Sequence, residues 1–203
     1  DGSINLDIVY TLFEEINLQN MRNDNVFLLR STVTPGTTRK LQEKYPDLNI
    51  VFNPEFLTER SAKLDFINQA RFILGGHHYY VNKVEELFRW RFGQTTPVIK
   101  TNYETAELIK YMNNCFFATK VSFMNEMYQI ADKCGADWEE AVEGFVRDGR
   151  IGHSHMNVPG HDGKFGFGGS CFPKDIQAMI NFSKVLGVDS NVLKGAWKTN
   201  LKV

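Results

Sequence analysis

The chain has 203 residues, of which 42% are hydrophobic and 23% charged, and its formal net charge is −1. These are ordinary values for a soluble globular protein with one large or two small domains. Without a stripe of basic residues, binding to nucleic acid is not expected. No apolar run reaches the roughly 18 residues that span a bilayer, so no membrane association is expected either. Three cysteines are too few for a disulfide framework and predict a reducing, cytoplasmic location.

The first half of the sequence alternates apolar runs typical of buried strands with stretches of helical periodicity. A strand, a helix and a second strand follow within fewer than ~30 residues, which is the spacing of a βαβ unit with parallel strands. We therefore expect residues 1–97 to form half of an α/β domain. Its expected elements are a helix over 3–21 capped by Ser3, a strand over 26–30, a helix over 35–45 capped by Thr34, strands over 49–52 and 71–76, and a helix over 81–92.

The second half, residues 98–203, is expected to be a helical domain. Thr101 and Glu104 have the spacing of a capping box, and the helix that they start should run ~30 residues to a C-cap at Gly135. A helix of this length, apolar on more than one side, passes through the middle of a domain or pairs with a partner, since ordinary helices have ~11–12 residues. Shorter helices are expected over 137–149, over 173–186 and from 190 onward, with a loop over 150–170.

The start of the sequence is also informative. It begins with Asp1 rather than methionine and enters a helical pattern at once, with apolar residues at Ile4, Ile8 and Leu12. A chain that begins inside such a pattern is expected to be cut from a longer one.

The sharpest chemical feature is the segment FGFGGSCFPKD, residues 165–175. Glycines before Cys171 allow other atoms to approach closely, and Pro173 is typical of the first turn of a helix. Cys171 is therefore expected at a helix N-terminus, where backbone N–H groups and the nearby Lys174 favour the nucleophilic thiolate. Asp175, one turn further, is placed to orient a water or accept a proton. The alternative is a buried structural cysteine, since free cysteines are commonly buried and inert.

Two predicted strands are followed by polar side chains, and open α/β sheets bind ligands beyond the carboxyl ends of their strands. After the second strand, Glu55 and Glu59 are two carboxylates four residues apart that suit acid–base chemistry. After the first, Ser31 and Thr32 precede a helix N-terminus that suits a phosphate or an ordered water. The structural alternatives are solvated glutamates at a helix start and simple helix capping.

The long helix carries a further polar pair. Lys110 and Asn114 lie one turn apart on the same face, so a cation and an amide are available together to stabilise an oxyanion. The structural alternative is a polar stripe on a solvated face. Cys115 and Cys134 lie in the same helix and are interpreted as core residues.

Three histidines, His153, His155 and His161, raise the question of a zinc site with Cys171. Their spacing matches no structural zinc module, so no metal site is predicted.

The order of these signals resembles the UDP-glucose/GDP-mannose dehydrogenase family over about residues 1–200. The segments that carry the resemblance are STVTPGT, NPEFLTERSAKLDF, ETAELIKYMNNCFFATKVSFMNEM, RDGRIG and FGFGGSCFPKD. The combination of FGGSCFPKD with NPEFL is specific to the family. NPEFLTERSA and the RIG before a Gly-rich loop look closer to the UDP-glucose enzymes than to the UDP-N-acetylmannosamine enzymes. The resemblance implies part of a Rossmann-like NAD-binding domain, followed by a central helical domain whose long helix forms a homodimer.

The resemblance also implies an activity, namely the four-electron oxidation of the C6 alcohol of UDP-glucose, with NAD as cofactor. It makes Cys171 the nucleophile that forms a thiohemiacetal and then a thioester. Its other implied assignments are Lys110 and Asn114 for the oxyanion, Thr32 and Asp175 for a water, Glu59 as a base, Thr32, Glu59 and Lys174 for contacts to NAD, Glu55, Phe56, Leu57, Phe167 and Gly168 for the sugar-nucleotide pocket, and Arg150 for the substrate of the neighbouring subunit.

The sequence departs from the family in what it lacks. The Gly-rich dinucleotide fingerprint, the acidic residue that binds the adenosine ribose and the C-terminal nucleotide-binding domain are absent from it. It is therefore expected to hold the catalytic centre without most of either binding half. Three alternatives stay open: the same chemistry on GDP-mannose, a non-catalytic dimerisation fragment, and a cysteine hydrolase with His155 or His161 as its base.

Overall fold

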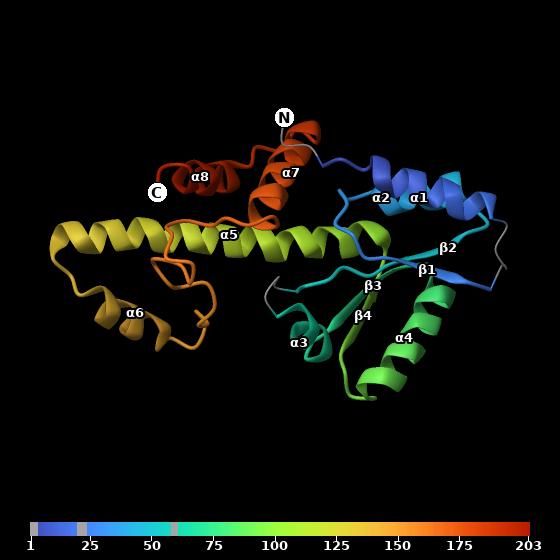
Figure 1. Cartoon of the computed structure of the whole chain (residues 1–203), viewed down its shortest axis with the longest axis horizontal. Helices are drawn as coiled ribbons and strands as arrows, with labels where there is room; N and C mark the ends of the chain where they lie inside the picture. Colours follow the sequence, from blue (N-terminus) through green and yellow to red (C-terminus); the bar gives the residue numbers. More distant parts are fainter. Residues whose placement is uncertain (1–3, 20–23, 58–60) are drawn as a thin grey trace. The chain divides into compact units, whose positions relative to one another are not determined.

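The computed structural model of the chain describes residues 4–19, 24–57 and 61–203 (Figure 1). The predicted Ser3 cap and the predicted base Glu59 lie outside the described residues, as does the end of the first predicted helix. The chain divides into two compact units, Ile4–Lys110 and Tyr111–Val203, and the division falls inside the long helix α5 (Tyr103–Cys134). The boundary predicted at residues 97 and 98 lies before that helix.

The first unit is built on a four-stranded sheet with the order β1 (Val26–Leu29), β2 (Asn49–Phe52), β3 (Phe72–Gly76) and β4 (Val98–Thr101). β1 and β2 are parallel, as the βαβ spacing predicted. β3 runs antiparallel to β2 and parallel to β4, so the expected parallel sheet is in fact mixed. The reason lies after β2, where the connection carries only the 6-residue helix α3 (Ala62–Ile67). The chain re-enters the sheet at the end where β2 finishes, so β3 runs in the opposite direction. A parallel neighbour would need a crossover connection back to the end where β2 begins.

Alternate strand positions build an apolar core on each face of this sheet. In β2, Ile50 and Phe52 belong to one core and Val51 to the other. Figure 1 shows α1 (Asp7–Leu18) and α2 (Thr37–Lys44) over the first face, and α3 with α4 (His78–Phe92) over the second. Because both faces are covered, β2 and β3 are close to continuous apolar runs, which is what made them recognisable.

α5 confirms the predicted long helix. It has 32 residues and ends before Gly135, whose φ of 74° is that of a glycine C-cap. Its start differs from the prediction: the Oδ1 of Asn102 accepts a hydrogen bond from the N–H of Thr105 at 2.8 Å, in place of a capping box of Thr101 and Glu104. None of the helices in the described residues is long and apolar enough to cross a membrane.

In the second unit, three helices accompany α5: α6 (Trp138–Val146), α7 (Phe172–Val185) and α8 (Asn191–Asn200). Figure 1 shows α7 and α8 on one side of α5 and α6 on the other. Cys115 shares a core with Ile176 of α7 and Ala196 of α8, as its predicted burial requires. Cys134 is exposed, so its predicted place in the core is wrong; the last turn of α5 is in solvent.

Candidate active site

Cys171 occupies the N-cap position of α7, as the glycine and proline pattern predicted. Pro173 lies in the first turn, where its missing N–H removes no helical hydrogen bond. The Cys171 side chain is exposed, and the Ser170 hydroxyl lies 3.8 Å from its Sγ. The alternative of a buried structural cysteine is therefore wrong. An accessible thiol at the N-terminus of a 14-residue helix is placed for nucleophilic chemistry.

The Gly-rich loop before the cysteine is held by two asparagines that no sequence pattern singled out. Asn200 of α8 accepts a hydrogen bond from the N–H of Phe167 at 2.6 Å and donates one to the Phe167 carbonyl at 3.0 Å. Asn125 of α5 accepts a hydrogen bond from the N–H of Gly166 at 2.9 Å. A Cβ at Gly166 would lie 2.5 Å from the Asn200 amide oxygen, which explains the glycine. The Phe167 ring is buried and Gly168 is exposed, so the loop presents backbone to solvent at Gly168.

Two predicted site residues of the second unit contact a third, Asp175, a carboxylate that is only 1% exposed. Its Oδ2 accepts a hydrogen bond from the Nδ2 of Asn114 at 2.5 Å, and its Oδ1 accepts one from the Nζ of Lys174 at 2.6 Å. The thiol of Cys115 lies next to this group, and burial raises the pKa of that thiol to about 12. Of these two thiols, Cys171 is the accessible one, while burial favours the protonated form of Cys115.

A second set of predicted residues lies in the first unit, after the carboxyl ends of the parallel strands β1 and β2. Thr32 follows β1 and is half-buried, while residues 55–57 follow β2. Lys110 of α5 is buried, and its Nζ donates a hydrogen bond to the Glu55 carbonyl at 2.6 Å. The same nitrogen lies 5.5 Å from the centre of the Phe56 ring. The structure therefore joins Lys110 to the NPEFL segment, and excludes a solvated face for this lysine.

Glu107 is a residue of this region that the sequence analysis missed. It caps α2, which begins at Thr37 rather than at the predicted position 35. The Glu107 carboxylate accepts hydrogen bonds from the N–H groups of Gly36 and Thr38 at 2.6 and 2.8 Å. The predicted cap, Thr34, instead bonds to the hydroxyl of Thr37. The helix N-terminus that was expected to suit a phosphate or a water therefore already holds a carboxylate of this chain.

Two further predicted residues lie in the loop between α6 and α7. Arg150 is exposed, and its guanidinium binds the carboxylate of Asp148, which lowers the pKa of that carboxyl. His155 has a φ of 61°, and its ring stacks on Phe117 with centroids 4.1 Å apart. Burial lowers the pKa of His155 and so favours its neutral form. Within the part of the chain that the structure describes, no three His, Cys, Asp or Glu side chains are grouped to hold a metal ion.

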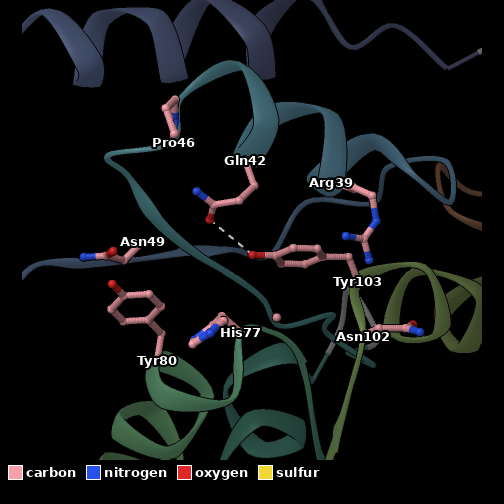
Figure 2. A pocket seen from close by; sticks show the side chains of 9 residues that line it. Arg39, Gln42, Pro46, Asn49, His77, Tyr80, Asn102 and Tyr103 are labelled. Atoms are coloured by element: carbon pink, nitrogen blue, oxygen red, sulfur yellow. Dashed lines mark hydrogen bonds between the residues drawn. The ribbon is translucent and has the colours of Figure 1, made fainter.

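A cavity of about 520 Å³ lies elsewhere in the first unit, between α2, the start of β2 and the residues that follow β3 and β4 (Figure 2). It contains no predicted site residue. The hydroxyl of Tyr103 donates to the Ile50 carbonyl at 2.9 Å and lies 3.2 Å from the Oε1 of Gln42, and burial raises its pKa to about 12. The Asn49 amide is bonded to the Asn25 carbonyl. These polar groups already serve the fold, so we assign the cavity no ligand.

Comparison with known proteins identifies the family. Residues 1–90 match the NAD-binding domain of the UDP-glucose/GDP-mannose dehydrogenase family, and residues 104–202 match its central domain. The UDP-glucose 6-dehydrogenase of Rickettsia typhi is 35% identical over 207 residues, which cover 98% of this chain and 46% of that relative. The chain thus spans about half the length of the curated relatives that it matches.

Solved structures agree. The UDP-glucose dehydrogenase of the archaeon Pyrobaculum islandicum is 30% identical with a TM-score of 0.84, over 100% of this chain and 47% of that one. The GDP-mannose dehydrogenase of Pseudomonas aeruginosa is 28% identical with a TM-score of 0.65, over 98% and 47%. Since the two family matches together span nearly the whole sequence, the chain belongs to the UDP-glucose/GDP-mannose dehydrogenase family.

Proposed function

We propose that the protein is an NAD-dependent dehydrogenase that oxidises the C6 alcohol of UDP-glucose to the carboxylate of UDP-glucuronate. The observation that carries the proposal is the exposed Cys171 at the N-terminus of α7, with Asp175 buried one turn behind it and bonded to Asn114. The choice of sugar nucleotide rests on relatives at 35% identity that are named UDP-glucose 6-dehydrogenase. Because the chain spans about half of their length, the activity is proposed for the complete protein.

The proposed reaction removes four electrons from C6 in two oxidation steps. In the first, the alcohol loses a proton and a hydride and becomes an aldehyde. The Cys171 thiolate adds to the aldehyde carbon, and the resulting thiohemiacetal loses its hydroxyl proton and a second hydride and becomes a thioester. Water then adds to the carbonyl carbon and the C–S bond breaks, which releases the carboxylate and returns the sulfur as a thiol. Covalent attachment to the enzyme keeps the reactive aldehyde from escaping between the two oxidations.

The oxyanion of the thiohemiacetal is assigned to Lys110 and Asn114. A buried ammonium and an amide N–H are suited to this charge, because preorganised donors in a site with little water stabilise a developing oxyanion strongly. An amide nitrogen carries two N–H groups. Asn114 gives one to Asp175 and keeps the other for substrate.

The hydrolytic water is assigned to Thr32 and Asp175, and Glu59 is the proposed base. Asp175 suits its role because both of its oxygens are held in place by hydrogen bonds. The remaining assignments concern the sugar-nucleotide pocket, which we attribute to Glu55, Phe56, Leu57, Phe167 and Gly168.

NAD is proposed to bind at the carboxyl edge of β1 and β2, where open α/β sheets bind dinucleotides. At this edge, the buried Nε of Arg30 and Oδ1 of Asn53 have no hydrogen-bond partner among the described residues, so the edge retains polar groups suited to a polar ligand. Thr32, Glu59 and Lys174 are the residues proposed to hold the cofactor. The chemistry that bound NAD supplies is hydride acceptance, once in each oxidation step. A thiol nucleophile must also stay reduced, and we therefore place the enzyme in the cytoplasm.

The test of this proposal is a substrate panel. The complete protein, supplied with NAD, is given UDP-glucose, GDP-mannose or UDP-N-acetylmannosamine in separate reactions, and NADH absorbance and product are measured. We expect two NADH for each UDP-glucuronate formed, and a kcat/KM for UDP-glucose about 100-fold above that for the other sugars. A preference for GDP-mannose would establish the sister activity instead. A stable dimer that turns over none of the three would favour a non-catalytic dimerisation module.

We further propose that the protein forms a homodimer through α5. In the second unit, one face of this helix exposes apolar side chains at helical spacing, with Met112 62% and Phe116 63% exposed and Phe123 and Ile130 continuing the row. A continuous apolar stripe on a surface helix is typical of a protein interface. In such a dimer, the exposed Arg150 is the residue assigned to the substrate of the neighbouring subunit.

Replacing Phe116 by aspartate is expected to convert the dimer to a monomer, because a charge at the centre of the stripe cannot be buried without a partner. Size-exclusion chromatography with light scattering measures the molar mass of the protein in solution. The matched control is Val185→Asp, which introduces the same charge at an exposed apolar position of α7 that is outside the stripe. If the Phe116→Asp variant remains a dimer, α5 does not form the dimer interface.

A further inference from the structure

Glu107 is a fully buried carboxylate on the second turn of α5, and none of the site assignments above gives it a role. Its Oε2 accepts a hydrogen bond from the N–H of Gly36 at 2.6 Å. Its Oε1 accepts two from Thr38, from the N–H at 2.8 Å and from the hydroxyl at 2.6 Å. All of these groups belong to the first compact unit. Both carboxylate oxygens are thus committed to the turn that links β1 to α2.

A side chain at the start of α2 could cap this helix without burying a charged carboxylate. Caps are ordinarily supplied by a Ser, Thr, Asp or Asn at the start of the helix itself, in contact with solvent. Here the N-cap residue is Gly36, which has no side chain, and the acceptor comes from a residue about 70 positions later in the sequence. Burial raises the pKa of Glu107, while its hydrogen bonds to Thr38 and Gly36 favour the charged carboxylate. The contact of Glu107 therefore does more than cap the N-terminus of α2, because it also attaches the turn over residues 31–36 to α5.

The same two turns of α5 also hold the segment after β2. Lys110, three residues after Glu107, donates a hydrogen bond to the Glu55 carbonyl at 2.6 Å. The carboxylate and the ammonium therefore fix both loops that carry proposed site residues, one after β1 and one after β2, to one rigid element. Thr32 lies in the turn that Glu107 holds, three residues after the end of β1 at Leu29 and four residues before Gly36.

We propose that Glu107 is a positioning residue that holds the Thr32 turn in register for hydrolysis of the thioester on Cys171. The inference rests on the proposed function, in which Thr32 positions the attacking water. In that step, the water oxygen bonds to the thioester carbonyl carbon and the C–S bond breaks. One proton of the water passes to the departing sulfur, and the other is released as the acid becomes the carboxylate. Neither oxidation consumes water. A loosened turn therefore slows the last step more than the two that precede it.

The test is Glu107→Gln in the complete protein. Glutamine has nearly the same shape as glutamate, and its amide oxygen can still accept hydrogen bonds from Thr38. Its NH₂ group would face the N–H of Gly36, and because both groups are donors, that hydrogen bond is lost. We expect kcat for UDP-glucose to fall about tenfold or more, as misplacement of a reacting group by a fraction of an ångström does. KM should stay within about twofold, since no substrate contact is removed. Rapid mixing should show a burst of two NADH per active site, and mass spectrometry should show an acyl group on Cys171.

Glu104→Gln is the matched control. Glu104 lies one turn earlier on α5 and also binds α2, through Arg39, but it is partly exposed and does not contact the turn. This variant has the same change of charge and should keep the wild-type kcat and show no burst. Equal slowing of oxidation and hydrolysis in Glu107→Gln, with no acyl-enzyme, would overturn the positioning role.

Amide hydrogen exchange of the wild-type protein separates this inference from the proposed function. The N–H groups of Gly36 and Thr38 should exchange slowly, because both are bonded to a buried carboxylate, whatever substrate the enzyme takes. Fast exchange at both would show that Glu107 does not hold the turn, even in an active enzyme. Slow exchange in a protein that oxidises no nucleotide sugar would instead reject the proposed function.

Discussion

Replacing Cys171 by serine is expected to lower the steady-state turnover of UDP-glucose by about 10³-fold or more, because a serine hydroxyl without an activating base is a far weaker nucleophile than a thiolate. The Cys171 side chain is exposed at the start of α7, so the substitution exchanges one sulfur for an oxygen without disturbing the packing of the core. NADH formation by the complete protein measures the loss, and circular dichroism checks that the helices are retained.

Cys134→Ser is the matched control, since Cys134 is the other exposed cysteine and lies at the end of α5. That variant should turn over at the wild-type rate. A thiol reagent should label Cys171 faster than Cys134 in the wild-type protein, because only Cys171 lies at a helix N-terminus. Turnover of Cys171→Ser within about tenfold of wild type would remove covalent catalysis from the proposed mechanism.

Replacing Asp175 by alanine should lower the free energy of unfolding by about 2–4 kcal/mol, since it leaves the Asn114 amide buried without its acceptor and removes the charge that pairs with Lys174. Chemical denaturation followed by circular dichroism measures the change. Activity should be lost as well, because the same carboxylate is proposed to position the hydrolytic water.

Asp175→Asn separates the two effects. Its amide oxygen can still accept from Asn114, so stability should fall less than in Asp175→Ala, while turnover should stay low for want of the charge. Asp189→Ala is the control for a lost ion pair, since Asp189 pairs with Lys194 at the exposed surface and this pair should contribute almost nothing to stability. An Asp175→Ala variant that unfolds at the wild-type denaturant concentration would show that the buried network is not structural.

The elements that the sequence predicted well are those with strong local signals. β2 and β3 were found because strands buried on both faces have an almost continuous apolar run. β4 was missed because it is a half-exposed edge strand that includes Lys100, and its place in the sheet comes from pairing with β3. The antiparallel direction of β3 was missed for a similar reason. Strand direction depends on where the chain re-enters the sheet, and no local pattern records that.

The same distinction between local signals and long-range contacts applies to the candidate site. Local sequence is enough to predict that Cys171 begins a helix, because the glycines and Pro173 act within a few residues of it. It also placed Lys110 and Asn114 one turn apart, since helical spacing is a local property. The partners of these groups depend on contacts between distant segments. Asn114 meets Asp175 across 61 positions, and Glu107 reaches Gly36 across 71. Such contacts arise when packed helices and strands bring distant segments together, and hydrogen bonds between buried groups then select their partners by geometry.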